Sequence, residues 1–135
     1  MRYMLDTNIC IHLMQGSPPG VVEKFAGLRV GDVVMSAVTH AELCYGIERH
    51  PGTREQAAAA LRGLVDDIPV LPFDEAAGGC YGVLRAAVRD RRRDALDRLI
   101  AAHAVSRDLV LVTNNEVDFC DYPGLCLENW VAPPP

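Results

Sequence analysis

The chain has 135 residues, half of them hydrophobic but only 6% aromatic, so we expect one domain over residues 1–131 with an aliphatic core and a frayed tail at 132–135. A net charge of −5 argues against a protein that coats nucleic acid electrostatically, and the five scattered cysteines match no zinc or disulfide pattern. No apolar run approaches the roughly 20 residues that span a bilayer, and the acid at position 6 comes too early for a signal peptide, so we expect a cytoplasmic protein.

The hydrophobic pattern predicts short strands that alternate with amphipathic helices. In chain order we expect a strand at 2–5, helices at 8–14 and 21–28, a strand at 32–35, helices at 39–50 and 53–66, a strand at 68–73, helices at 75–91 and 95–106, and strands at 109–112 and 125–128. Breakers such as Gly16-Ser-Pro-Pro-Gly20 separate the elements, and Asp74 suits the N-cap of the helix that follows it.

This alternation predicts an α/β fold, a three-layer α/β/α sandwich around a short parallel sheet with right-handed crossovers. The aliphatic strand at 109–112 suits the buried centre of such a sheet. Open parallel sheets bind ligands beyond the carboxyl ends of their strands, where the strand order reverses. If the first and fourth strands are neighbours, Asp6 and the loop at 114–118 emerge side by side at that edge.

Four acidic residues stand where strands end or where the following helices begin: Asp6, Glu42, Asp97 and Asp118. Carboxylates at the carboxyl ends of strands can converge on one point in an α/β sheet. Converging oxygen ligands suit Mg²⁺ or Mn²⁺, and such ions catalyse phosphodiester hydrolysis. The pattern therefore favours a metal-dependent hydrolytic site.

Each acid also has a purely structural interpretation. Asp6 could start a turn or cap the next helix, and Thr39-x-x-Glu42 matches a capping box. Asp97 is a favourable first-turn acid, and Asp118 fits a solvated loop charge. Taken together the acids are harder to explain in this way, because two of them follow strands whose ends we expect to adjoin.

The basic residues are mostly arginines. Only Lys24 is a lysine, and a group of arginines lies in the second half of the chain: Arg85, Arg89, Arg91, Arg92, Arg93 and Arg98. Three of them, Arg85, Arg89 and Arg92, share a helix face that either complements the helix C-terminus or contacts phosphate.

The helix at 95–106 contains a histidine on its apolar face. The residues that we expect this face to bury are Leu96, Leu99, Ile100 and His103. A histidine in that setting is a core residue more often than a catalytic base, so we expect His103 to be structural.

Five segments follow one another in order along nearly the whole chain. They are Met4-Leu-Asp-Thr-Asn8, Thr39-His-Ala-Glu42-Leu-x-Tyr-Gly46, Asp97-Arg-Leu-Ile-Ala-Ala-His-Ala104, Leu111-Val-Thr-Asn-Asn115 and Pro123-Gly-Leu-x-Leu-Glu-Asn-Trp130. Together they resemble the PIN-domain proteins, and specifically the VapC toxins of bacterial toxin–antitoxin pairs. The first segment alone is a weak signal, but the five in series are specific.

The resemblance implies an endoribonuclease that depends on Mg²⁺ or Mn²⁺, leaves 5′-phosphate and 3′-hydroxyl ends on its RNA, and is neutralised by a cognate antitoxin protein. It also suggests a homodimer. The catalytic acids map onto Asp6, Glu42 and Asp97, with Asp6 and Asp97 holding the metal and Glu42 acting as ligand or base. Many PIN domains have an aspartate where this chain has Asn115, so either Asn115 or Asp118 completes the site. Two further residues, Asn8 and Thr113, are candidates to orient the carboxylates.

Other function classes fit less well. Haloacid-dehalogenase-like phosphatases need Asp-x-Asp after the first strand and a late lysine, whereas this chain has Asn8 and a single early lysine, Lys24. The missing late lysine also argues against a phospho-receiver domain. A non-catalytic PIN fold that only binds RNA or protein would have lost Asp6 or Asp97, and both are present. The amide at Asn115 leaves this last alternative open.

Overall fold

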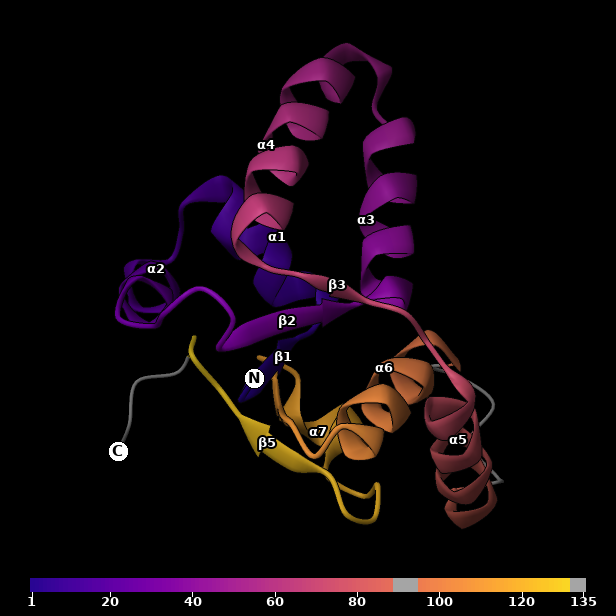
Figure 1. The fold of residues 1–135 in the computed structure, drawn as a ribbon. Helices are drawn as coiled ribbons and strands as arrows, with labels where there is room; N and C mark the ends of the chain where they lie inside the picture. Colours follow the sequence, from indigo (N-terminus) through magenta and orange to yellow (C-terminus); the bar gives the residue numbers. More distant parts are fainter. Residues whose placement is uncertain (89–94, 132–135) are drawn as a thin grey trace.

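A computed structural model describes residues 1–88 and 95–131 (Figure 1). Its elements, in chain order, are β1 (Tyr3–Leu5), α1 (Thr7–Gln15), α2 (Pro19–Ala26), β2 (Val33–Ser36), α3 (Ala37–Glu48), η1 (Pro51–Thr53), α4 (Arg54–Asp67), β3 (Val70–Leu71), α5 (Glu75–Ala87), α6 (Ala95–Ser106), β4 (Val110–Val112), α7 (Glu116–Phe119) and β5 (Cys126–Glu128). The expected tail at 132–135 and the arginines at 89 and 92 lie outside the described residues.

The five strands form one sheet in the order β3-β2-β1-β4-β5, and every neighbouring pair is parallel. This arrangement confirms the expected α/β fold. Strand β1 is central, because Tyr3 pairs with Val33 of β2 on one side and with Val110 of β4 on the other. The strand order reverses between β1 and β4, and this is the place where parallel sheets bind ligands. The strand at 109–112 was expected at the centre of the sheet, and as β4 it lies directly beside the central strand β1.

Alternating side chains on β1 divide the core into two layers. Tyr3 and Leu5 pack with residues of α1, α2, α3 and α4, whereas Met4 packs with residues of α5, α6 and α7. Figure 1 shows these two groups of helices on opposite sides of the sheet, as expected for an α/β/α sandwich. All three side chains are at most 1% exposed. Burial on both faces explains why the strands are continuous apolar runs.

Short-range signals set several helix ends. Helix α1 ends at Gly16, whose φ of 71° lies in the left-handed region that favours glycine. Asp74 caps α5, as expected, by accepting a hydrogen bond from the N–H of Ala77 at 3.0 Å. Helix α5 ends at Ala87 rather than near residue 91.

The start of α3 differs from the expectation. Helix α3 begins at Ala37, and Ser36 caps it by accepting a hydrogen bond from the N–H of Val38 at 3.1 Å. The capping box predicted at Thr39 and Glu42 is therefore wrong, because both residues lie inside the helix. Glu42 therefore does not cap the start of α3.

Helix α6 buries a different set of residues than its apolar pattern predicts. Ile100 and His103 are buried as expected, but Leu96 is 48% exposed and Arg98 is only 2% exposed. The helix lies between the sheet and α5 and also contacts α3, so more than one of its faces is covered. A single-stripe pattern cannot describe such a helix.

The segment after β4 is also more regular than predicted. Residues Glu116–Phe119 form the short helix α7, where we expected a loop, and Phe119 packs into the core beside Tyr122. Within residues 1–88 and 95–131, no helix combines the length and the apolar character that crossing a bilayer requires.

The two-layer core can be tested in β4. Leu111 is fully buried in the layer formed with α5, α6 and α7. We expect Leu111→Ala to lower the free energy of unfolding by about 2–5 kcal/mol in urea denaturation, because the cavity it leaves refills only partly. Val30→Ala is the control, because Val30 is 74% exposed, and it should change stability by less than about 0.5 kcal/mol. Equal losses in the two variants would contradict this description of the core.

Candidate functional site

Asp6 lies at the carboxyl end of the central strand. It is 5% exposed, and its backbone N–H donates to the carbonyl of Val112 in β4 at 3.0 Å. Its Oδ1 accepts a hydrogen bond from the N–H of Ile9 at 2.9 Å and so caps α1. The capping interpretation of Asp6 is therefore correct, but it does not exclude a second role.

The surroundings of Asp6 disfavour its negative charge. Burial raises the pKa of this carboxyl above its usual value, and the charge of Glu42 raises it further. Hydrogen bonds from the hydroxyl of Thr113 and from the backbone N–H groups of Ile9 and Asn8 lower the pKa and offset part of the increase. The net direction is upward. A bound cation would stabilise the ionised form of such a carboxyl.

Glu42 lies on α3 and is half-buried next to Asp6. Its Oε1 accepts a hydrogen bond from the hydroxyl of Thr7 at 2.7 Å. Thr7 was missed in the sequence, although it directly follows Asp6 in the segment Leu-Asp-Thr-Asn. The hydroxyl holds one oxygen of Glu42 in a defined position, and α1 thus begins with residues that contact both acids.

Thr113, Asn115 and Asp118 form a connected group at the end of β4. Thr113 is fully buried, and its hydroxyl oxygen accepts a hydrogen bond from the N–H of Asn115 at 3.0 Å, while the same hydroxyl bonds to Asp6. The side-chain amide of Asn115 donates to the carboxylate of Asp118 in α7. Thr113 therefore lies where a residue that orients Asp6 should be. The backbone N–H of Asn8 bonds to Asp6, and Asn8 itself is exposed.

Asp97 lies in the first turn of α6 and is half-buried. The residues Leu96 and Leu99, on either side of it, line a cavity of about 1000 Å³ together with Glu42 and Thr7. The first turn of α6 and the acid on α3 therefore face a common cavity. Helices α3 and α6 also contact each other.

The donor set of the site is made of oxygen atoms. Among the residues that the structure describes, no three His, Cys, Asp or Glu side chains gather closely enough to enclose a metal ion. What the described residues offer is the electrostatically coupled pair Asp6 and Glu42. This arrangement fits Mg²⁺, which is usually held by one or two carboxylates and keeps several of its waters. A cation at this place would also offset the burial and the charge of Glu42, which both disfavour the negative charge of Asp6.

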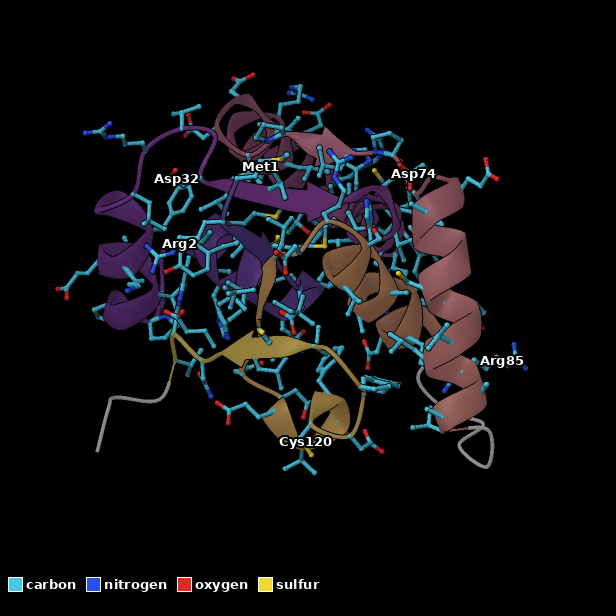
Figure 2. The ribbon with its side chains drawn as sticks, turned by 60° about the horizontal axis from the view of Figure 1, so that its bottom comes forward. Met1, Arg2, Asp32, Asp74, Arg85 and Cys120 are labelled. Carbon is cyan, nitrogen blue, oxygen red and sulfur yellow. The ribbon has the colours of Figure 1, made fainter. Side chains whose placement is uncertain are left out.

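Arg85 is the described member of the predicted arginine face. It is exposed on α5, donates a hydrogen bond to the hydroxyl of Tyr81 at 3.0 Å, and extends outward from the helix in Figure 2. Its position is compatible with both of its predicted roles, helix-end complement and phosphate contact. Arg89 and Arg92 lie outside the described residues.

His103 is a core residue, as expected. Its Nδ1 lies 2.7 Å from the hydroxyl oxygen of Ser36, the residue that caps α3, and its ring packs edge-on against Phe73. Burial lowers the pKa of His103, so the neutral imidazole is favoured. The contact fixes α6 against the end of β2 and does not involve the acids.

The sequence resembles known proteins over nearly its whole length. The profile of one family, described as the PIN domain, matches residues 3–125. A protein of Shigella flexneri named tRNA(fMet)-specific endonuclease VapC is 40% identical over 132 residues, which cover 96% of this chain and 98% of that protein.

Solved structures show the same fold. The crystal structure of VapBC2 from Rickettsia felis, bound to a DNA fragment from its promoter, contains a chain that is 31% identical with a TM-score of 0.87, and the match covers 96% of this chain and 99% of that one. The crystal structure of DNA-bound VapBC from Salmonella typhimurium matches at 36% identity and a TM-score of 0.87, covering 96% and 98%.

The buried charge of Asp6 predicts an effect of Asp6→Asn on stability. An acid whose pKa is raised in the folded state begins to destabilise that state as the pH rises past its unfolded-state pKa. The penalty is complete above the folded-state pKa and disappears again below the unfolded-state pKa. Asparagine caps a helix as well as aspartate does. In EDTA at pH 7, Asp6→Asn should therefore be at least as stable as the wild type in urea denaturation, and the difference should shrink on acidification.

The exposed Glu23 on α2 provides a matched control. Glu23→Gln removes a solvated charge and should have little effect at any pH. A metal-free Asp6→Asn protein that is clearly less stable than the wild type would show that the charge of Asp6 stabilises the fold, the opposite of what its burial predicts.

Proposed function

We propose that this chain, which belongs to the PIN-domain family and within it to the VapC proteins, is a metal-dependent endoribonuclease and the toxin of a toxin–antitoxin pair. One observation carries the proposal. The buried Asp6 at the strand-order switch feels the charge of the half-buried Glu42, and a threonine hydroxyl bonds to each acid, in a chain that is 40% identical to a named endonuclease. Asp6 caps α1 by itself, so a purely structural role for Asp6 would not require a second acid beside it.

The cation in this proposal is Mg²⁺ or Mn²⁺. Asp6 and Asp97 would hold it, with Glu42 as a further ligand or as the base. When bound, such an ion lowers the pKa of its water and stabilises charge on the phosphate oxygens. Asp6 would then keep its negative charge despite burial, because the cation offsets the unfavourable surroundings.

The residues of the chain act on water and on their neighbours. If Glu42 is the base, it accepts the proton of the attacking water, and the hydrogen bond from Thr7 fixes its Oε1. As the oxygen of this water forms a bond to phosphorus, the bond between phosphorus and the 3′-oxygen breaks, and the 3′-oxygen takes up a proton from solvent. The products are a 5′-phosphate and a 3′-hydroxyl. Thr113 orients Asp6 through its hydroxyl.

Asn115 and Asp118 would complete the site as one unit. Their hydrogen bond joins a neutral amide to a carboxylate, and the backbone of Asn115 joins this unit to Thr113. We propose that the pair acts through bound water, since the carboxylate of Asp118 is already engaged with Asn115. The charge that many PIN domains supply at position 115 would then come from Asp118.

The proposed substrate is RNA. The relative from Shigella flexneri is named for an activity on tRNA(fMet), so initiator tRNA is the first substrate to test. The arginines at 85, 89 and 92 are proposed phosphate contacts. A non-catalytic PIN fold that binds RNA or protein is the alternative, and only the amide at Asn115 favours it.

The proposed partners are an antitoxin and a second copy of the chain. The two solved structures above are described as VapBC complexes on DNA. By analogy, we propose that a small DNA-binding protein encoded beside this chain binds and inhibits it, and that the chain itself forms a homodimer.

Catalysis can be separated from folding at Asp97. Asp97→Asn keeps the size and much of the helix-start preference of the residue but removes a negative ligand. We expect cleavage of initiator tRNA in Mg²⁺ to fall by orders of magnitude, because a ligated metal contributes several kcal/mol to the transition state and each ~1.4 kcal/mol is tenfold. A folded Asp97→Asn protein that cuts at the wild-type rate would remove Asp97 from the site.

Mg²⁺ or Mn²⁺ should raise the melting temperature of the wild type and not of Asp6→Asn.

The partner prediction is tested in cells. Expression of the chain alone should slow growth, and co-expression of the small neighbouring protein should restore it. The Asp97→Asn variant is the control, since it should be harmless while still folding. Normal growth with a folded, abundant wild-type protein would favour the binding-module alternative.

A further inference from the structure

Three residues follow one stripe of α3 beyond the candidate site. Glu42, Tyr45 and Arg49 are spaced at i, i+3 and i+7, so they lie on one face of the helix and its C-terminal cap. All three line the cavity of about 1000 Å³ that Leu96 and Thr7 also line. The stripe therefore begins at a proposed catalytic acid and ends at a cation.

Tyr45 is not packed in the way that large aromatic side chains usually are. It is 66% exposed, and the guanidinium of Arg49 lies over its ring at 5.2 Å from the ring centroid. Other exposed apolar side chains, Ile11 and Leu96, line the same cavity. An exposed ring beside a cation and an apolar wall is the surface on which unpaired nucleobases stack.

The helix also leaves space beside Tyr45. Gly46 lines the cavity, and a Cβ added there would meet nothing within 4 Å. Close packing therefore does not require a glycine at this position of α3, although glycine lowers helix stability by about 1 kcal/mol relative to alanine. The surface of α3 between Glu42 and Arg49 is therefore open at Gly46.

We propose that Tyr45 and Arg49 form a binding subsite for one unpaired nucleotide of the RNA, adjacent to the phosphate that is cut. The base stacks on the ring of Tyr45, and Arg49 binds a phosphate oxygen. This inference rests on the proposed ribonuclease function. Neither residue touches the reacting atoms, so their role is in binding.

The spacing along α3 agrees with this arrangement. At 1.5 Å per residue, Tyr45 lies ~4.5 Å and Arg49 ~10 Å beyond Glu42 along the helix axis. Stacked nucleotides rise by ~3.4 Å each. The base on Tyr45 would thus belong to the nucleotide next to the cut, and Arg49, whose guanidinium lies 5.2 Å from the centroid of the Tyr45 ring, would reach a phosphate of that nucleotide.

The test is single-turnover cleavage of 5′-labelled initiator tRNA, which gives the half-saturating enzyme concentration and the maximal rate separately. For Tyr45→Ala we expect the half-saturating concentration to rise on the order of 5- to 150-fold, with the maximal rate within about threefold of wild type. Tyr45→Phe and Tyr45→Trp should restore binding, because stacking needs the ring and not the hydroxyl.

Two further variants test the phosphate contact of Arg49 and the open surface at Gly46 separately. Arg49→Gln should reduce the slope of log affinity against log salt by about 0.7, the value for one phosphate contact to a single strand, whereas Tyr45→Ala should leave the slope unchanged. Gly46→Leu should weaken binding by filling the open surface. Gly63→Leu is its matched control, because Gly63 is an exposed glycine of α4 that also has no neighbour within 4 Å of a Cβ.

The outcomes separate the two levels of inference. A wild-type protein that cuts no RNA would count against the proposed function itself. Wild-type cleavage with an unchanged half-saturating concentration in Tyr45→Ala would overturn the subsite alone. Loss of antitoxin binding in Tyr45→Ala, with RNA cleavage unaffected, would assign this surface to the protein partner and likewise overturn the proposal.

Discussion

The parallel pairing of β1 with both β2 and β4 is the constraint on which the site depends. Because all three strands run in the same direction, their carboxyl ends reach the same edge of the sheet. Asp6, Ser36 and Thr113 therefore lie at neighbouring strand ends, although they are far apart in the sequence. The same pairing buries β1 on both faces, so the first residue after the strand, Asp6, is held by a rigid support.

A buried carboxylate at this position carries an energetic cost that the rest of the site reduces. Desolvation of Asp6 and the nearby charge of Glu42 both act against ionisation, and the hydrogen bond from Thr113 offsets only part of this effect. The remaining imbalance makes the site a place where cation binding is favourable. Under the proposed function, the metal affinity of the site and the destabilising charge of Asp6 would have one physical cause, the burial of that carboxylate.

Helix α3 connects folding and function through its different faces. Leu43 and Ile47 pack into the core and also line the cavity, and Glu42, Tyr45 and Arg49 line the same cavity. The cap at Ser36 joins the same helix to β2, and His103 of α6 contacts that cap. The start of α3 is thus fixed from two sides.

The sequence by itself determined the order of the strands and of most helices, and the α/β class. These follow from local rules: apolar period, breakers such as the segment at 16–20, and caps such as Asp74 depend only on nearby residues. Local rules failed where several surfaces compete for one helix. The exposure of Leu96 and the burial of Arg98 depend on how α6 lies between the sheet, α5 and α3.

Only the tertiary structure decided how the acids are connected. The hydrogen bond from Thr7 to Glu42 spans 35 positions, and that from Thr113 to Asp6 spans two strands of the sheet. The sequence also suggested a capping box for Glu42, and the structure removed it by starting α3 at Ala37. Local patterns report what a short segment prefers, whereas the surroundings of a charge depend on segments that only the folded sheet brings together.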